Sequence, residues 1–495
     1  MSENKELKRT LGLFDATSIV AGSMIGSGIF LVTSIMMRDI GSAGWMIVLW
    51  LLTGLITVFA ALSYGELAGM MPNAGGQYVY IQRAYGRMIS FLYGWTVFTV
   101  IQTGVIAAVA VAFSNYTAII VPLLFPTLGL DLNSDLLIIG NAHMTYAQLV
   151  AILSIVLLTY INSRGVRNGK IIQLIFTSAK LFALFTLIIL GIAIGLSTNT
   201  LADNFTNMWE ASTTEILKDG SISVVPIAGF ALLGAMGATI INSLFSSDAW
   251  NNVTFIAGEI KDPKKNIPRS LFLGTLIVTL IYILANIAYL ALLPIHGTPR
   301  AASAVGQGIM FASEYRVGAS AASVIFGNIG VYIMAVLIMV STFGCNNGLI
   351  LAGSRLFYAM SKDGLFFKNA QKLNNKEVPG VALWIQCVWA CMLCLSGQYG
   401  DLLEYATFAS LLFYILTIGG IFILRKNEPN IERPYKAFGY PVIPALYILI
   451  TTAICIDLLI YKPTSAGFGL GIVLLGIPIY YLTNKKTNIS NEIIE

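Results

Sequence analysis

Apolar stretches of about twenty residues recur along the whole sequence, and this feature constrains the fold most. Each is long enough to cross the hydrocarbon core of a bilayer, which is about 30 Å thick. Only 11% of the residues are charged, against about 25% in soluble domains. The pattern predicts an all-α integral membrane protein. Its twelve predicted transmembrane helices cover residues 14–36, 45–70, 88–123, 145–162, 171–196, 226–257, 271–293, 322–353, 380–398, 402–424, 441–460 and 467–483.

The lysine and arginine residues fall mainly on one side of the predicted spans. With the N-terminus placed in the cytoplasm, 23 of the 29 Lys and Arg residues lie in cytoplasmic segments, five lie outside, and one lies within a span. Such an excess of basic residues orients membrane proteins. We therefore expect cytoplasmic termini, 1–13 and 484–495, in a multi-pass protein of the plasma or inner membrane. The polar start MSENKELKRT runs directly into the first span, so no cleavable signal peptide is expected.

Residues that enzymes and metal sites need are scarce. GVRNGK at 165–170 is one residue short of a phosphate-binding loop and lacks its Ser or Thr. The only histidines, His143 and His296, fall in predicted external loops, and Cys391 and Cys394 form a CxxC on an apolar helix, which favours packing. We expect no enzyme activity, no metal and no cofactor. The basic cytoplasmic loops explain the net charge of +5 without a nucleic-acid partner.

Glycine and serine interrupt the first predicted span in GSMIGSG, residues 22–28. Glycine weakens a helix by about 1 kcal/mol relative to alanine. Backbone groups in hydrocarbon must stay hydrogen-bonded unless they line a polar cavity. An unwound segment there would offer N–H groups to an anion and carbonyl groups to a cation. Gly22-x-x-x-Gly26 is also a helix-packing motif, so this stretch alone supports both interpretations.

The sixth predicted span, 226–257, has a second interruption, where Ser246, Ser247 and Asp248 break an apolar run. Transporters with two inverted repeats have interrupted helices at corresponding positions of the two halves. The two breaks therefore predict two five-helix repeats of opposite orientation, followed by two additional helices. The halves share no clear residue-level identity, so this prediction rests on the topology and the breaks. The predicted units are 14–196, 226–424 and 441–483.

Several longer motifs resemble those of amino acid–polyamine–organocation permeases, especially the L-type amino acid transporter-like branch. The resemblance covers most of the chain in order. The motifs are GSMIGSGIF in the first span, ALSYGELAGMMPNAGGQYVYIQRAYG (61–86), DAWNNVTFIAGEIKDPKKNIPRS (248–270), GSRLFYAMSKDGLF (353–366) and ERPYKAFGYPVIP (432–444). The resemblance implies a LeuT-like fold of twelve helices, with the first and sixth broken, and transport of amino acids by alternating access.

The resemblance also implies a substrate site built from main chain. The amides of Gly26, Ser27 and Gly28 are expected to bind the substrate carboxylate. The carbonyl groups of Met24 and Phe245 are expected to accept from the α-ammonium group, and the Phe245 ring to close over the substrate as an external gate. A zwitterion carries its anion and cation close together, so main-chain N–H and carbonyl groups can bind both without a buried ion.

Lys180 is the one basic residue within a predicted span, about nine residues from its cytoplasmic end. Lysine at a helix centre costs roughly 2.5–3.5 kcal/mol, so such residues usually face a cavity. Snorkelling toward the cytoplasm is the alternative. In the resembling family a lysine on the fifth helix contacts the broken first helix, where sodium-coupled relatives bind a cation. The resemblance implies sodium independence, with Lys180 as a fixed charge or a proton carrier.

Asp248 differs from many animal L-type members, which have a small residue at this point. Its carboxylate could sense the substrate amine, pair with a lysine, or cap the following half-helix. We place Ser246 and Asp248 in the substrate site. A carboxylate facing the substrate favours small polar or cationic amino acids. We interpret Glu66 and Glu259, near the cytoplasmic ends of their spans, as gate or anchoring charges.

These features predict a sodium-independent secondary transporter of amino acids that works as an exchanger or with protons. A polyamine or organic-amine permease of the same fold is the alternative, although a substrate without a carboxylate would leave the 26–28 amides unmatched. A channel, the remote alternative, would need a continuous polar pore. Animal L-type transporters join a glycoprotein through an external cysteine. Segment 124–144 has no cysteine, so we expect no disulfide-linked heavy chain, and the predicted partners are the amino acid and the bilayer.

Overall fold

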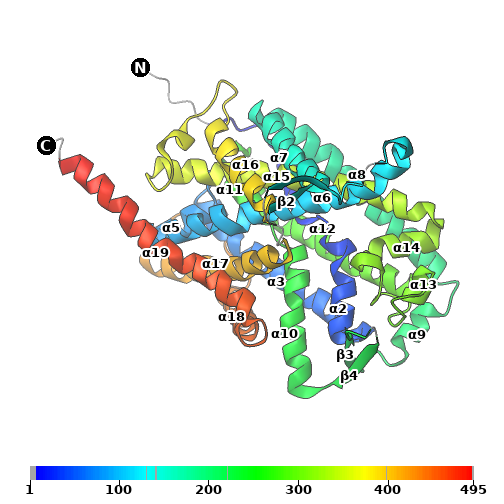
Figure 1. Cartoon of the computed structure of the whole chain (residues 1–495). Helices are drawn as coiled ribbons and strands as arrows, with labels where there is room; N and C mark the ends of the chain where they lie inside the picture. Colours follow the sequence, from blue (N-terminus) through cyan, green and yellow to red (C-terminus); the bar gives the residue numbers. More distant parts are fainter. Residues whose placement is uncertain (1–6, 130, 140–141, 220, 397–398, 493–495) are drawn as a thin grey trace.

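The computed structural model describes residues 7–129, 131–139, 142–219, 221–396 and 399–492. Helices form most of the described chain (Figure 1), and ten helical segments in it are long and apolar enough to cross a membrane. They are α3 (Ala43–Met70), α5 (Arg87–Thr96) continued through the π-turn η2 (Val97–Ile101) into α6 (Gln102–Leu124), α7 (Tyr146–Ser163), α8 (Val166–Gly195), α10 (Gly229–Ser246), α12 (Pro263–Leu292), α15 (Ile329–Lys362), α17 (Tyr399–Asn427), α18 (Val442–Tyr461) and α19 (Pro463–Glu492).

Three apolar helices are shorter: α1 (Leu13–Met24), α14 (Val317–Phe326) and α16 (Gly380–Cys394). The first and ninth predicted spans fall on α1 and α16. At 1.5 Å per residue, the 15 residues of α16 extend about 22 Å, which is less than the bilayer core. Length and composition therefore identify ten of the twelve predicted spans.

Two predicted boundaries are wrong. Residues 322–353 were expected to form one span, but α14 ends at Phe326 and α15 begins at Ile329 and runs to Lys362. Gly327, with a φ of 65°, separates the two helices, and glycine adopts this left-handed conformation without a steric cost. The sixth span was expected from residue 226, but residues 226 and 227 belong to a strand and α10 begins at Gly229.

Two β-hairpins lie outside the helices, where the all-α prediction expected only loops. They consist of β1 (Asp135–Ile139) with β2 (Ala142–Thr145), and β3 (Ala211–Ile216) with β4 (Ile222–Ile227). In the second hairpin Ala211 pairs with Ile227 and Ile216 with Ile222. The sequence explains it, because β-branched residues flank an Asp-Gly pair, which is a strong hairpin signal.

Short helices connect the longer elements. They are α2 (Val32–Ile40), α4 (Gln77–Tyr85), α9 (Thr200–Thr206), α11 (Asn252–Phe255) and α13 (Ala304–Gln307), with the 3₁₀ turns η1 (Gly28–Phe30), η3 (Pro126–Leu128), η4 (Ala257–Glu259), η5 (Ser313–Tyr315) and η6 (Lys368–Gln371). Of these, α2 and α11 matter most for the site, because each continues the chain after an interrupted helix.

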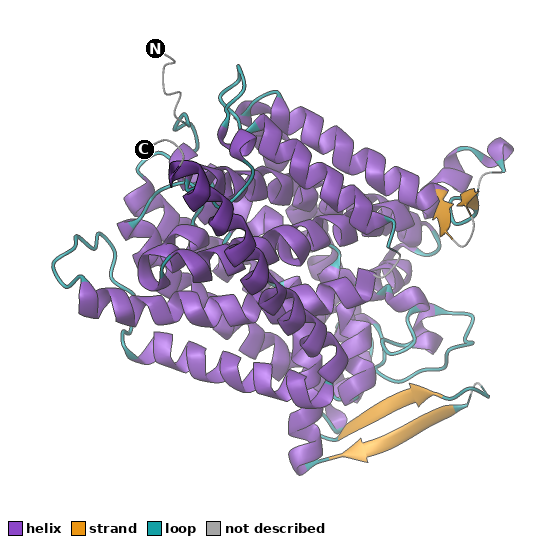
Figure 2. Cartoon of the chain, turned by 60° about the vertical axis from the view of Figure 1, so that its left-hand side comes forward, coloured by secondary structure: helices purple, strands orange, loops and turns teal. Residues whose placement is uncertain are grey.

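The helical body separates two ends of the molecule. At one end, the amides of Thr10 and Leu11 donate to the Glu259 carbonyl. At the other end, the β3–β4 hairpin lies against α2, where the Thr213 hydroxyl donates to the Asp39 carbonyl. Figures 1 and 2 show this hairpin on the side opposite the chain ends. Between these ends α1 packs against α8, α12 and α15, which places its C-terminus inside the body.

Candidate functional site

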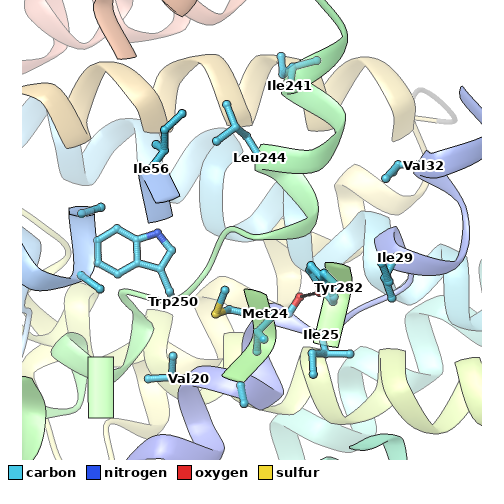
Figure 3. Close-up of a cluster of buried hydrophobic side chains, with 14 of the residues drawn as sticks. Val20, Met24, Ile25, Ile29, Val32, Ile56, Ile241, Leu244, Trp250 and Tyr282 are labelled. Atoms are coloured by element: carbon cyan, nitrogen blue, oxygen red, sulfur yellow. Dashed lines mark hydrogen bonds between the residues drawn. The ribbon is translucent and has the colours of Figure 1, made fainter. Parts of the chain in front are cut away.

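The two interrupted helices meet at one point. The first ends at Met24 and resumes at Gly28, and the other ends at Ser246 and resumes at Asn252. A Cβ atom on Gly28 would lie 2.8 Å from Ser246 Cβ and 3.1 Å from its Cα, so only glycine permits this approach. In Figure 3, α10 ends in an unwound segment close to Trp250 and to the end of α1. Both interruptions predicted from the sequence are present.

Lys180 binds the C-terminal end of α1. Its Nζ donates to the carbonyl groups of Gly22 (2.8 Å), Ile25 (2.6 Å) and Ser341 (3.1 Å). The side chain is 1% exposed and forms no ion pair among the described residues. The last carbonyl groups of a helix carry partial negative charge, which an ammonium group stabilises. Lys180 therefore does not snorkel, and its charge lies at the break.

Other side chains bind the remaining carbonyl groups of this break. The Ser341 hydroxyl donates to Ile25 (3.1 Å) or Gly26 (3.0 Å), and Cys345 Sγ donates to Ser23 (3.0 Å). These donors come from α15. The Tyr282 hydroxyl lies near the Met24 carbonyl oxygen. Together with Tyr282 and Lys180, these donors reach every carbonyl group from Gly22 to Gly26.

Tyr282 links the two broken helices. Its hydroxyl lies 3.2 Å from the Met24 carbonyl oxygen and 2.9 Å from that of Ser246, so it can donate to either. The tyrosine comes from α12, is fully buried, and packs edge to face on Trp50. Figure 3 shows its hydroxyl directed toward Met24. Tyr282 and Ser341 were not predicted from the sequence, because neither residue type stands out within an apolar helix.

The amides of the same break are in the opposite situation. In the described chain no hydrogen-bond acceptor is recorded for the N–H groups of Gly26, Ser27 and Gly28. Gly22, by contrast, is a packing glycine, because a Cβ atom there would meet the side chains of Gln173 and Thr177 on α8. The two interpretations of GSMIGSG thus apply to different glycines. The break combines hydrogen-bonded carbonyl groups with bare amides, which is the arrangement that attracts an anion.

One cavity brings the predicted substrate residues together. Met24, Gly26, Ser27, Gly28, Phe245, Ser246 and Asp248 all line it, whereas Lys180 lies behind α1 and does not. Its other lining residues come from α1, α4, α5, η2, α6, α11, α15 and α17, and from the unwound segment before α11. A Cβ atom on Gly26 would meet only Cys345 Sγ, at 3.5 Å. The Phe245 carbonyl already accepts from the Asp248 amide (3.1 Å), which leaves its second lone pair for a ligand.

Asp248 presents a carboxylate to this cavity. Tyr414 on α17 donates to its Oδ1 at 2.5 Å, and no ion pair with Asp248 forms among the described residues. The capping alternative is not supported, since the N-cap of α11 is Asn251 and its side chain caps nothing. Pairing with a lysine is not observed either. The carboxylate is therefore available to a positively charged group in the cavity.

A polar cluster that the sequence analysis missed lies along another wall of the cavity. Gln77 Oε1 accepts from Asn251 Nδ2 (2.8 Å) and from the Tyr93 hydroxyl (3.0 Å), and Gln77 Nε2 donates to Thr417 (3.0 Å). These four residues come from α4, the unwound segment before α11, α5 and α17. Their hydrogen bonds fix α4 against the second break. No sequence signal identified the cluster, because its members are far apart in the chain.

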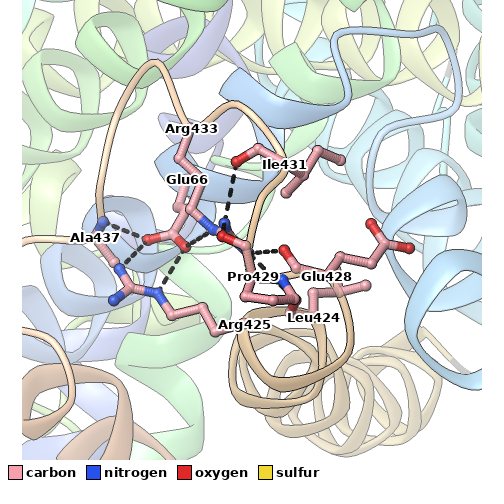
Figure 4. Close-up of polar contacts among 8 residues, drawn as sticks. All are labelled: Glu66, Leu424, Arg425, Glu428, Pro429, Ile431, Arg433 and Ala437. Atoms are coloured by element: carbon pink, nitrogen blue, oxygen red, sulfur yellow. Dashed lines mark hydrogen bonds and ion pairs between the residues drawn. The ribbon is translucent and has the colours of Figure 1, made fainter.

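Glu66 and Glu259, expected as gate or anchoring charges, are both buried and both form ion pairs. Glu66 Oε2 lies 2.6 Å from Arg425 Nη2 and accepts from the Ala437 amide (2.7 Å), and Arg433 is also close (Figure 4). Glu259 Oε1 lies 2.8 Å from Arg355 Nε, and both side chains are fully buried. Glu66 thus fastens the segment between α17 and α18, and Glu259 joins η4 to α15.

Comparison with known proteins agrees with this geometry. The amino acid permease family model matches residues 11–482. Over 481 residues, the chain is 31% identical to the Mus musculus large neutral amino acids transporter small subunit 2, covering 96% of this chain and 81% of that protein. It is 28% identical over 491 residues to the Mus musculus Asc-type amino acid transporter 1 (97% and 82% covered), and 27% identical over 482 residues to the Homo sapiens b(0,+)-type amino acid transporter 1 (96% and 88% covered).

These relatives are transporters and not enzymes, as the sequence analysis expected. The family and the relatives also agree with the resemblance found in the motifs. The ten long apolar helices are those of a protein that crosses the membrane several times. The chain therefore belongs to the amino acid permease family, within its L-type amino acid transporter-like branch.

Proposed function

We propose that this chain carries amino acids across the membrane by alternating access, with the substrate bound between the two interrupted helices. One observation carries the proposal: side chains bind the carbonyl groups of the first break, whereas its three amides have no recorded acceptor in the described chain. Carboxylate is the anion common to all amino acids, and bare amides before a helix bind such groups. The α-ammonium group then binds the free lone pairs of the Met24 and Phe245 carbonyls.

The proposed architecture is LeuT-like, with twelve spans. Ten are the long helices, the first is α1 with α2, and the ninth is α16. Residues 14–196 and 226–424 form the two repeats, and 441–483 the additional helices. Corresponding helices of the two repeats pack against each other, α3 on α12 and α6 on α15, which supports a pseudo-twofold relation between the repeats.

Lys180 supports the proposal of sodium independence. Its ammonium group supplies a positive charge at the end of α1, bound to three carbonyl oxygens, so no metal ion is needed there. We assign it the fixed-charge role, because all three of its hydrogen-bond partners are backbone groups that cannot take up its proton. A proton carrier would need water or a titratable group in contact with Nζ to exchange its proton.

Asp248 narrows the proposed substrate class. Its carboxylate lines the cavity and has only a tyrosine hydroxyl as a hydrogen-bonding side-chain partner in the described chain. A substrate that brings a second positive group or a small polar side chain would satisfy it, whereas a bulky apolar side chain would not. We therefore propose small polar or cationic amino acids.

We propose cytoplasmic termini in a plasma or inner membrane, since 23 of 29 basic residues then lie inside. The relative large neutral amino acids transporter small subunit 2 is, by its name, one subunit of a larger assembly. We propose that this chain has no disulfide-linked heavy chain. Four of the five cysteines are buried, and the fifth, Cys391, is partly exposed within the apolar helix α16 rather than in an external loop.

The test is uptake of radiolabelled amino acids into proteoliposomes that contain the purified chain. Uptake only when the vesicles hold internal amino acid would establish exchange, and uptake driven by a proton gradient without it would establish proton coupling. Replacing external sodium with choline should leave the rate unchanged. Failure of every amino acid under all gradients would overturn the proposal.

The polyamine alternative is tested in the same vesicles. Inhibition of amino acid uptake by putrescine or spermidine at concentrations where amino acid amides are inactive would favour it. We expect the opposite result. An amino acid amide, which lacks the carboxylate, should not compete with amino acid uptake, because the three main-chain amides then have no anion to bind.

A further inference from the structure

We infer that a groove between α3, α12 and the segment before α18 binds an anionic phospholipid. The groove has a volume of about 560 Å³. Leu62 forms part of its wall on α3, Arg269 and Phe272 on α12, and Lys436 and Phe438 on the segment 428–441 that links α17 to α18. It is separate from the substrate cavity and shares no lining residue with it.

The groove is strongly basic. Four cationic side chains line it: Lys264, Lys265, Arg269 and Lys436. Lys264 pairs with Glu432 across 2.8 Å, but both are exposed, 49% and 73%, so this pair contributes little. No ion pair is recorded for the other three cations in the described chain. Three unpaired cations around one hollow form a site for an anion with several oxygen atoms, such as a phosphate ester.

The rest of the groove is apolar and lies on the surface of the protein. Leu62, Pro268, Phe272 and Phe438 line it, and Phe272 and Phe438 are 37% and 66% exposed. In a protein that crosses the membrane, exposed apolar residues of α12 face the acyl chains, whereas its first turn lies at the headgroups. The groove therefore joins an anion site to a hydrocarbon-facing surface. Phospholipids with a net negative headgroup match both parts, and basic pockets between membrane helices bind such lipids.

The groove is also preformed. Glu66 fixes the segment 428–441 through the Ala437 amide and Arg433, and it also pairs with Arg425 at the end of α17 (Figure 4). Tyr435 of the same segment packs so closely on α3 that a Cβ atom on Gly65 would lie 2.8 Å from its ring. A ligand therefore finds Lys436 already facing the start of α12. Such preorganisation distinguishes this groove from an ordinary solvated row of lysines.

The test is native mass spectrometry of the full chain in detergent, titrated with dioleoylphosphatidylglycerol or dioleoylphosphatidylcholine. The test variant is Lys265→Gln/Arg269→Gln/Lys436→Gln. The control is Lys368→Gln/Lys372→Gln/Lys376→Gln, which removes three exposed cations from the segment between α15 and α16. We expect the wild type and the control to bind one phosphatidylglycerol at least tenfold more tightly than phosphatidylcholine. The test variant should lose at least tenfold in affinity for phosphatidylglycerol.

Two outcomes would overturn the inference. Equal loss of affinity in both triple variants would assign the effect to the general charge of this face. Displacement of the bound phosphatidylglycerol by an equal concentration of glycerol 3-phosphate would mean that the cations bind a free anion and that the apolar part of the groove contributes nothing. All six substituted side chains are exposed, so both variants are expected to fold.

Discussion

Lys180 carries its charge inside the helical body, where its ammonium group contacts oxygen atoms of α1 and α15. It lies fourteen residues after Val166, the first residue of α8, and so near the middle of that helix. An ammonium group at this depth is stable only when polar partners replace its hydration shell. At the scale of single residues, the site therefore depends on a few polar side chains whose partners are main-chain groups.

Replacing Lys180 with methionine removes the ammonium group and keeps most of the side-chain volume. The carbonyl groups of Gly22 and Ile25 then lose a charged donor, which typically costs about 1.5–3 kcal/mol. We expect the initial rate of amino acid uptake to fall at least tenfold in proteoliposomes. Phe182→Ala is the control, because this side chain on the same helix is 75% exposed. Normal uptake by Lys180→Met would show that the charge is dispensable.

Replacing Asp248 with asparagine tests the substrate class. Asparagine keeps the size and a hydrogen-bond acceptor for the Tyr414 hydroxyl but removes the charge. A charge-assisted hydrogen bond is roughly twice as strong as a neutral one, so competition by lysine or arginine should weaken at least tenfold. Competition by alanine or serine should change less than threefold. A uniform change across a panel of twenty amino acids would contradict the proposed role.

At the scale of elements, the site exists because two helices stop and restart at the same depth. The approach of Gly28 to Ser246 keeps the breaks together, and Tyr282 hydrogen-bonds across them. Neighbouring helices bind the freed carbonyl groups, which meets the requirement that unwound backbone in a membrane protein be satisfied by protein or by a cavity. The interruption is therefore a property of five helices rather than of GSMIGSG alone.

The two glycines of this break should differ in their tolerance of alanine. A methyl group on Gly28 would overlap Ser246, whereas one on Gly26 would contact Cys345 Sγ at 3.5 Å, an ordinary distance. We expect Gly28→Ala to abolish uptake and lower the thermal stability in detergent. Gly26→Ala should keep the stability of the wild type. Equal stability of both variants would mean that the helices separate without cost at this point.

Replacing Glu66 tests whether its ion pairs stabilise the fold. Glu66 is 1% exposed and lies in contact with two arginines and one amide, so Glu66→Gln leaves the largely buried Arg433 and the Ala437 amide without their anion. Removing one partner of a buried ion pair costs about 3–5 kcal/mol. The control is Arg83→Gln, which breaks the exposed pair with Glu428 and should cost about 0–1 kcal/mol. Thermal unfolding in detergent measures both, and equal midpoints would contradict the structural role of Glu66.

At the scale of the whole molecule, the described chain has two chemically distinct ends. Basic loops and the buried clamps of Glu66 and Glu259 lie at the end that contains Thr10 and Leu11. The β3–β4 hairpin and α9 lie at the other end, where Asn204 binds the carbonyl groups of Leu290 and Leu293. The basic end is the one we propose to face the cytoplasm.

Cysteine labelling in intact cells tests this orientation. A membrane-impermeant maleimide should label Lys218→Cys in the hairpin, and it should not label Lys376→Cys until the cells are opened. Both positions are exposed, and the wild type, whose cysteines are mostly buried, gives the background. Labelling of Lys376→Cys in intact cells would invert the proposed topology.

Hydrophobicity made the spans predictable, because each long apolar helix must be solvated by lipid on its own and leaves a local signal. The breaks at 22–28 and 246–248 were predictable for the same reason, since polar residues and glycines interrupt that signal. The donors Tyr282 and Ser341 were not, because a tyrosine or serine in an apolar helix shows its partner only after folding. The Gln77 cluster also depends on tertiary contacts that no local pattern records. The stop at Gly327 is local to that glycine and its left-handed backbone, but the surrounding apolar run hid it.

The bare amides of Gly26, Ser27 and Gly28 have a consequence for the transport cycle. When the transporter closes around an empty cavity, the three N–H groups lose their water and gain no other acceptor, which costs about 1–3 kcal/mol for each group. A loaded carrier avoids that penalty. Reorientation of the empty transporter should therefore be the slow step of the cycle. Turnover should be fastest when an amino acid is present on both sides of the membrane.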